Sequence, residues 1–445
     1  MIKKRIILSC ALTELILMTS IFVFAEEDFP ADDIFSEEAL FSDDMFVEEK
    51  DVVSENAAEE LDEQSIGISG TLRAVVNHNN YNLEESWINL GETDNNYLTS
   101  QLAANILFDA RFKNRIKGFL DLELHYDYND RDSDSEADYL IKELTVDIPY
   151  RNKIYIKAGK QVLKWGRSYF WNPTDLINIE RKDISDLDKS REGTEGVKIH
   201  IPYGVEKNIY LFLDTRDINL AEDIAVSGKY EFLTGNTEMS FSAWTKKDFK
   251  PVYGYDISSR IADIDLRGEI SLSKGDNYNI MYYDTLKVDK EDDKWISRIS
   301  AGFTKFFDYG DISDRISVSG ELYYNSNGYD KNIYKKIDSI TNLQEKQTKK
   351  TEYLSRVYQA NMNSKYYAAV FTNINEFIDQ DLSLNINGII NLIDYSKTIS
   401  AGVSYQARTD LSFDFNLMKF LGDKNTEATL FGTDYIISMG SNYRF

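Results

Sequence analysis

Oppositely charged side chains and aromatic ones are mixed in the stretch GKQVLKWGRSYFWNPTDLINIERKDISDLDKSREGTEG, residues 159–196. Three bases precede two acids in it, in the order Lys160, Lys164, Arg167, Asp175 and Asp183. If this stretch is a loop folded into a water-filled pore, the bases face the acids across it. The resulting transverse field would sort solutes by charge and dipole. A surface loop whose aromatic residues mark a membrane interface fits the same sequence, and both interpretations stay open.

Acidic residues at alternate positions form a second group: Asp121, Glu123 and Asp127, with Asp109 on a neighbouring stretch. Alternate residues on one strand face lie about 6.8 Å apart. One metal ion cannot easily bridge that gap, because metal–ligand bonds are about 2 Å long. We therefore interpret the group as an acidic stripe lining a lumen, opposed there mainly by Arg111 and favouring cations.

Enzymatic chemistry has little support in the sequence. His78, His125 and His200 are its three histidines, and no local motif pairs one of them with a nucleophile. A phosphate-binding glycine loop of the P-loop kind is also missing. Cys10 is the single cysteine and lies near the start, which excludes thiol catalysis and zinc–cysteine sites further along. We expect no enzyme, no metal and no cofactor.

Strands with one apolar and one polar face must position the charged residues. Apolar and polar side chains alternate in QLAANILFDARF, GFLDLELHYDY and DLSLNINGIINL, at 101–112, 118–128 and 381–392. From residue 65 onward no apolar run is long enough for a membrane helix. Such strands suit either a water-soluble sandwich or a transmembrane barrel, which turns its apolar faces to lipid and keeps a polar lumen.

The spacing of the connections favours the barrel. Short turns are expected at 113–117, 149–153, 202–208, 233–238, 273–277, 308–314, 375–381 and 406–410. The other connections are expected at 79–96, 128–138, 163–194, 217–222, 246–253, 288–294, 325–365, 394–397 and 418–433, most of them longer. Outer-membrane barrels alternate short periplasmic turns with longer outer loops in this way. The sequence thus predicts an all-β, transmembrane antiparallel barrel of about 18 strands over residues 65–445, and 16 to 20 strands would also fit.

The N-terminal region reads as an export signal followed by an acidic tail. Lys3, Lys4 and Arg5 precede an apolar run to Phe24, and cleavage is expected after Ala25, so residues 1–25 form a signal peptide. Residues 26–64 contain 17 acidic residues and one basic residue. We expect this segment to be a disordered periplasmic tail, either a solubilising spacer or a docking segment for a periplasmic partner. The net charge of -25 argues against nucleic-acid binding.

The C-terminal stretch DYIISMGSNYRF, residues 434–445, alternates like a strand and ends on an aromatic residue. We expect it to close the barrel against the first strand near residues 66–77, because closure removes the edge that lipid cannot satisfy. The stretch resembles the C-terminal signature of bacterial outer-membrane proteins. That resemblance implies recognition of Tyr443 and Phe445 by the barrel assembly machinery, and a place among the lipids of a diderm outer membrane with the tail in the periplasm.

A second resemblance involves the charged stretch with which we began. Its G-K-Q…W-G…N-P-x-D element is similar to one in a group of outer-membrane porin-like proteins, at Gly159, Lys160, Gln161, Trp165, Gly166, Asn172, Pro173 and Asp175. The resemblance implies a channel for small hydrophilic solutes, and the acidic stripe suggests a preference for cations. A surface-display or adhesin barrel and a polysaccharide-export barrel are the alternatives. A wide lumen would favour a channel or an exporter, and a plugged lumen would favour display.

Overall fold

The computed structural model describes residues 64–445, apart from 83–85, 88–94, 130–133, 164, 176, 178–191, 217 and 219. The predicted signal peptide and nearly all of the predicted acidic tail lie outside this range. So do two of the candidate site residues, Lys164 and Asp183.

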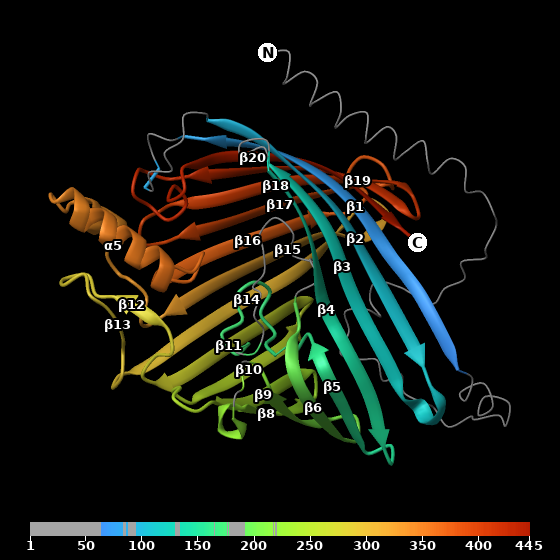
Figure 1. Cartoon of the computed structure of the whole chain (residues 1–445). Coiled ribbons are helices and arrows are strands. Elements are labelled where there is room, and N and C mark those ends of the chain that lie inside the picture. Colours follow the sequence, from blue (N-terminus) through green and yellow to red (C-terminus); the bar gives the residue numbers. More distant parts are fainter. Residues whose placement is uncertain are drawn as a thin grey trace. The chain divides into compact units, whose positions relative to one another are not determined.

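Eighteen antiparallel strands form one closed sheet, as the sequence predicts (Figure 1). The strands are β1 (Ser65–Tyr81), β2 (Asn96–Arg111), β3 (Lys117–Asn129), β4 (Asp134–Tyr150), β5 (Ile154–Gln161), β6 (Thr194–Tyr203), β7 (Lys207–Asp214), β8 (Ala225–Thr234), β9 (Thr237–Thr245), β10 (Val252–Ile261), β11 (Ile264–Lys274), β14 (Trp295–Tyr309), β15 (Ile312–Asn325), β16 (Tyr366–Ile374), β17 (Leu382–Asn391), β18 (Lys397–Arg408), β19 (Leu411–Leu421) and β20 (Thr433–Arg444). Each strand pairs with the next one of the sheet along the chain, and β20 pairs with β1. The predicted all-β barrel of about 18 strands is therefore confirmed.

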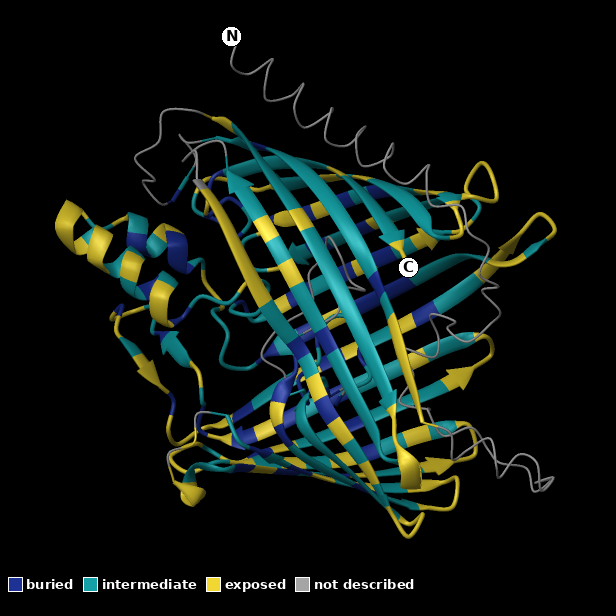
Figure 2. Ribbon diagram, turned by 45° about the vertical axis from the view of Figure 1, so that its right-hand side comes forward, coloured by how far each residue is buried: buried dark blue, intermediate teal, exposed yellow. Residues whose placement is uncertain are grey.

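The predicted alternation gives the barrel an apolar outer surface and a polar interior. Along several strands, exposed residues alternate with buried or half-buried ones (Figure 2). On β4, Leu144, Val146 and Ile148 are exposed, whereas Thr145 between them is buried. The register places Leu102 of β2 opposite Tyr126 of β3, and both are exposed. An exposed apolar band on the outside of a closed sheet is what a hydrocarbon environment requires.

One turn lies elsewhere than predicted. Residues 273–277 do not join two strands at the short-turn end. The turn there consists of Ala262 and Asp263, which join β10 to β11 with φ values of 45° and 63°. Two successive residues with positive φ make the tight hairpin turn that matches strand twist. The sequence at this turn has no glycine, the usual signal for such a backbone, so the stretch reads as one long strand.

The glycine of the mispredicted turn lies at the opposite end of the barrel. Gly275 has a φ of 83°, and a side chain there would meet the carbonyl oxygens of Glu291 and Asp292 at 2.9 and 2.8 Å. It begins the connection between β11 and β14. This connection contains a separate hairpin of two short strands, β12 (Asn279–Met281) and β13 (Val288–Lys290), where the sequence predicts one barrel strand.

The barrel closes at its last residue. Phe445 and Gly70 exchange two backbone hydrogen bonds of 2.9 and 3.0 Å, and the pairing continues to Tyr81 and Thr433. Closure thus involves residues 70–81 of β1, somewhat later than the predicted 66–77. Tyr443 lies opposite Leu72 in this register. Recognition of this end by the assembly machinery stays a prediction.

The connections at the end of the barrel away from the short turns, which we call the loop end, build a small apolar core of their own. The connection between β15 and β16 forms two helices, α4 (Ile333–Asp338) and α5 (Leu343–Arg356). Buried side chains from four connections pack together there: Trp87, Met281, Leu286, Ile333, Tyr334, Ile337, Tyr353, Val357 and Leu430. We call this unit the cap. Among the described residues, no helix is both long enough and apolar enough to cross a membrane.

A paired glycine substitution tests the closure. A Cβ atom on Gly70 would lie 2.4 Å from the Asn105 carbonyl oxygen and 2.7 Å from the Phe445 ring. We expect Gly70→Ala to destabilise the barrel by about 1–3 kcal/mol, because the backbone oxygen cannot move aside. Heat-modifiability on gels and the midpoint of thermal unfolding measure this. Gly67→Ala is the control, since its nearest neighbour would be 4.0 Å away. Equal midpoints for the two variants would refute the tight closure.

Candidate channel constriction

A segment of the connection between β5 and β6, residues 165–175, is bound to the inner wall of the barrel on strands far from β5. We call it the inserted segment. Its backbone amides donate to Glu269 on β11. Ser168 N lies 2.6 Å from Glu269 Oε1, and the Arg167 amide donates to the same oxygen. Thr174 Oγ1 donates to the other oxygen, Oε2, at 2.8 Å. One buried carboxylate thus fixes two places of the segment.

A second wall carboxylate, that of Glu321 on β15, accepts from three successive amides. Tyr169 N and Phe170 N donate to Oε2 at 2.8 and 3.1 Å, and Trp171 N donates to Oε1 at 2.6 Å. Hydrogen bonds to a charged acceptor are stronger than those to a neutral one. A buried carboxylate such as that of Glu321 is stabilised only when its oxygens accept hydrogen bonds. Glu321 is therefore an anchor for the middle of the inserted segment.

The aromatic side chains of the inserted segment pack against inner-wall residues. Trp171 stacks on Tyr323 of β15, with ring centroids 5.5 Å apart and 16° between the planes. Its Nε1 donates to the Asn361 carbonyl at 2.9 Å. Tyr169 and Phe170 lie against Phe371 of β16. Of the two interpretations left open by the sequence, folding into the barrel interior therefore holds for this described part.

Arg167 extends its side chain to three carboxylates on three consecutive strands. Its Nε lies 2.6 Å from Asp256 on β10, its Nη2 lies 2.8 Å from Glu231 on β8, and its Nη1 contacts Glu238 on β9. Burial alone would lower the pKa of the guanidinium, but the three carboxylates raise it above its usual value. Lys229 adds a second base 3.2 Å from Glu231. The cluster therefore contains three acids and two bases.

The other predicted constriction residues have varied surroundings. Lys160 on β5 pairs with Glu192, 2.6 Å away. Asp175 donates its backbone N–H to the Asn172 carbonyl at 3.1 Å and lines a cavity on the loop side of the inserted segment. The proposed opposition of bases to Asp175 and Asp183 stays a prediction, because Lys164 and Asp183 lie outside the described residues.

The predicted acidic stripe is on β2 and β3, and polar partners accompany it. Glu123 Oε2 lies 2.5 Å from Lys142 Nζ. Asp121 accepts from Asn105 at 2.5 Å, and Asp127 accepts from Gln101 at 2.7 Å. Arg111 lies 3.6 Å from Asp109. His125 lies between Glu123 and Asp127, at 4.0 and 3.8 Å. No set of three or more potential metal ligands clusters in the part of the chain that the structure describes.

Lys142 is a site residue that the sequence reasoning missed. The register between β3 and β4 skips it, since Asp121 faces Glu143 while Leu122 faces Ile141. This bulge changes which face of β4 is polar and sends Lys142 inward. The stretch LIKEL, residues 140–144, breaks the alternation and is the signal that could have revealed the bulge. The wall anchors Glu269 and Glu321 had no such signal, because each resembles any lumen-facing polar residue.

A further buried carboxyl, that of Glu427, lies in the connection between β19 and β20, which contributes to the cap. It accepts from Tyr367 Oη and Asn391 Nδ2, both at 2.8 Å, and from the Asn361 amide at 2.9 Å. Burial, followed by the nearby Asp394 carboxylate, raises the pKa of Glu427 to about 7. Asn361 also accepts from Trp171. Glu427 thereby connects the cap to the inserted segment through one residue.

Removing an anchor tests whether the wall carboxylates fix the inserted segment. Glu321→Ala leaves three amides without their acceptor, so we expect the free energy of local opening to fall by about 2 kcal/mol. Hydrogen exchange at residues 169–171 should then accelerate roughly thirtyfold. The control is Glu206→Ala, which changes an exposed glutamate in the turn between β6 and β7. Unchanged exchange in Glu321→Ala would show that the segment is held by other contacts.

The pKa of Glu427 predicts a pH-dependent cap. Well below its ordinary value of 4.5, the carboxyl is neutral whether the cap is closed or open. As the pH rises to about 7 and above, the closed cap must bury a carboxylate and loses up to about 3 kcal/mol of stability. Hydrogen exchange at residues 426–430, corrected for intrinsic rates, should be faster at pH 8 than at pH 5.

Glu427→Gln should abolish that pH difference, because the amide does not titrate. Asp423→Asn is the control, since Asp423 is strongly exposed in the same connection. A pH difference that survives in Glu427→Gln would assign the effect to another group.

No protein-family model and no curated protein matches the sequence of this chain. Solved structures match its fold. OccK2 (OpdF) of Pseudomonas aeruginosa matches with a TM-score of 0.51 and 11% identity, covering 86% of this chain and 99% of that one. OccK8 (OprE) of P. aeruginosa matches at 0.52 and 9%, and covers 86% and 98%. OccAB3 of Acinetobacter baumannii matches at 0.51 and 10%, and covers 86% and 99%. OccK2 has also been solved in complex with glucuronate, with a TM-score of 0.50 and 10% identity over 86% and 98% of the two chains. This chain shares the closed 18-stranded barrel of these proteins.

Proposed function

We propose that this protein is an outer-membrane channel that passes small hydrophilic solutes and prefers cations. The observation that carries the proposal is the inserted segment, which the carboxylates of Glu269 and Glu321 fix to the inner wall. A segment held in this way narrows an aqueous path and lines it with charged side chains, as selective channels do.

The barrel wall supports the membrane location. Its outward faces are apolar at alternate positions, as on β4, and the sheet has no free edge. The shared fold of the Occ proteins agrees with this location. The glucuronate complex of OccK2 supports a solute that is small and hydrophilic. Export to the outer membrane also agrees with the signal peptide expected at residues 1–25.

The charges near the proposed constriction support the preference for cations. The positive charge of Arg167 is shared by Asp256, Glu231 and Glu238, and that of Lys160 is matched by Glu192. In the stripe, Arg111 lies beside Asp109 and Lys142 binds Glu123, while Asp121 and Asp127 accept from Asn105 and Gln101. Around Arg167, three carboxylates outnumber the two bases Arg167 and Lys229, and this excess of negative charge raises the local concentration of cations.

Planar-bilayer recordings of the purified barrel test the proposal. In a tenfold KCl gradient at low salt, we expect a reversal potential with the sign of a potassium-selective pore. Its magnitude should be below the roughly 59 mV of a pore that passes potassium alone. Glu238→Gln should reduce it, because one of the three carboxylates around Arg167 becomes neutral. Glu345→Gln is the control, because it changes an exposed glutamate in the first turn of α5. A chloride potential would show that the bases dominate the narrowest point, and Lys160→Glu should then shift the potential most.

The same recordings separate the alternatives. A surface-display or adhesin barrel would give no ion current, although it would still show heat-modifiability. A polysaccharide-export barrel would give a large conductance with weak ion selectivity. At the centre of a wide lumen, dissolved salt screens the charges of the wall. The proposed channel gives a smaller, selective conductance that responds to Glu238→Gln.

A further inference from the structure

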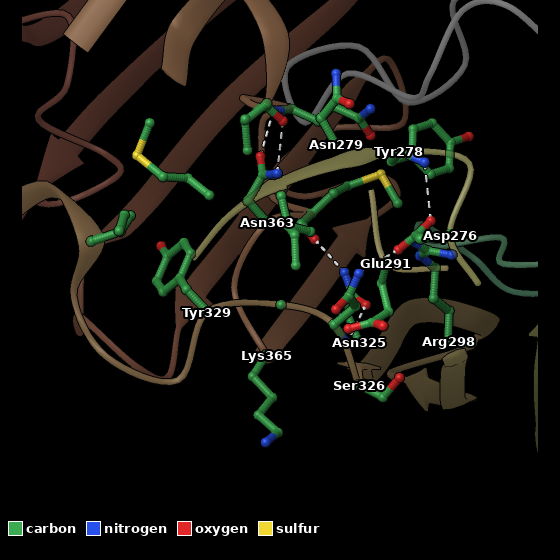
Figure 3. A pocket seen from close by; sticks show the side chains of 18 of the residues that line it. Asp276, Tyr278, Asn279, Glu291, Arg298, Asn325, Ser326, Tyr329, Asn363 and Lys365 are labelled. Carbon is green, nitrogen blue, oxygen red and sulfur yellow. Dashed lines mark hydrogen bonds and ion pairs between the residues drawn. The ribbon is translucent and has the colours of Figure 1, made fainter. Parts of the chain in front are cut away.

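A cavity of about 240 Å³ opens at the loop end, outside the residues that fix the inserted segment (Figure 3). Its walls are the connections 275–294 and 326–365 and the adjoining ends of β14 and β15. Asn172, Pro173 and Asp175 of the inserted segment form another part of its lining. The cavity is smaller than the range of about 300–1,000 Å³ usual for drug-sized ligands, so its occupant is a small molecule.

The bases that line the cavity are each paired with an acid that lines it too. Arg298 binds Asp276 through contacts of 2.7 and 2.8 Å, and both side chains are largely buried. The other two pairs are Lys294 with Glu291 at 2.6 Å and Lys365 with Asp330 at 4.0 Å. Asp175 adds a fourth acid. An anionic ligand would have to displace a carboxylate from its partner, so the cavity disfavours anions.

The remaining lining is rich in tyrosine rings and amides. Five tyrosines line the cavity, among them Tyr278, together with five asparagines that include Asn279, Asn327 and Asn363. Tyr278 is partly exposed, and the Arg298 guanidinium lies 5.2 Å from its ring centroid. A ring face offers apolar area with a polar edge, and hydroxyls and amides both donate and accept.

Hydrogen bonds within and between the two connections that form the walls hold much of this polar lining in place. Asn327 Nδ2 donates to Asp276 at 2.8 Å, and Asn279 Nδ2 donates to the Arg356 carbonyl at 3.1 Å. Asn363 Nδ2 donates to the Val357 carbonyl at 2.9 Å. The side-chain oxygens of Asn279 and Asn327 keep acceptor capacity, whereas that of Asn363 already accepts from the Gln359 amide. A site whose groups are already held in place loses little conformational entropy when a ligand binds.

We propose that this cavity is a binding site for an uncharged saccharide about one sugar ring in size. Such a ligand offers many hydroxyls to amides and tyrosines and a C–H face to the Tyr278 ring, and it brings no charge to disturb the ion pairs. The site extends the proposed function by placing solute capture at the loop end, before the inserted segment. Binding and conduction are separate measurements, so the two proposals can fail independently.

The test is a titration of the full-length protein in detergent with glucose and with glucuronate, followed by ligand-observed NMR or calorimetry. These two probes share a ring and differ in one carboxylate. We expect glucose to bind with a Kd on the order of millimolar, as suits so small a ligand. Glucuronate should bind about tenfold more weakly, because its carboxylate meets the four acids of the cavity.

Two variants assign the binding to the cavity. Tyr278→Ala should weaken glucose binding by about five- to tenfold, since the ring face is lost. Tyr395→Ala is the matched control, because Tyr395 is a strongly exposed tyrosine between β17 and β18 that does not line the cavity. Asp276→Asn should reverse the preference toward glucuronate, because it leaves Arg298 without its carboxylate partner.

The outcomes decide between the two proposals. Undetectable glucose binding, equal binding of glucuronate, or wild-type binding by Tyr278→Ala would each overturn the saccharide site. If conductance is normal in that case, the channel proposal stands. Saccharide binding without any conductance would support the site and refute the channel.

Discussion

A peptide group in hydrocarbon has no water to bond with, and this constraint governs the whole barrel. Each of the 18 strands forms backbone hydrogen bonds with both of its neighbours. The last pairing, between Phe445 and Gly70, leaves no free sheet edge. The absence of a side chain at Gly70 lets the terminal ring lie against β1. Once the sheet is closed, its outward side chains must be apolar and its inward ones can be polar. The polar interior is then available for function.

Inside the barrel, the same requirement for hydrogen bonding is met by side chains. The inserted segment has irregular backbone, and its amides need acceptors. Glu269 and Glu321 provide them, each with both oxygens in use. This explains how carboxylates come to be buried on the inner wall, where an unsatisfied charge would be costly. A carboxylate that accepts several amides also fixes the segment in one position, which a selective path requires.

The cap follows a different principle, because it is a small core made by connections alone. Trp87, Met281, Tyr334 and Leu430 come from four different connections, and none of these connections could bury its apolar side chains by itself. Glu427 lies where this core meets the barrel strands, through Tyr367 and Asn391. Asn361 connects the cap to the inserted segment, because its amide donates to Glu427 and its carbonyl accepts from Trp171. The cavity with paired charges lies between these two units, so its shape depends on both.

The sequence by itself determined the features that depend on local periodicity. Alternation assigns each residue to a face without knowledge of its partners, so most of the strands and the closing C-terminal strand were predictable. Their number was predicted correctly because the turn missed between β10 and β11 is offset by the barrel strand expected where β12 and β13 form a separate hairpin. Irregularities were not predicted. No glycine marks the positive φ at Ala262 and Asp263, and the bulge at Lys142 shows only as a break in the alternation at residues 140–144. Only the tertiary structure decided which carboxylates anchor the inserted segment. Ser168 and Tyr169 bond to residues 101 and 152 positions away, and no pattern along the chain records contacts that the closure of the barrel creates.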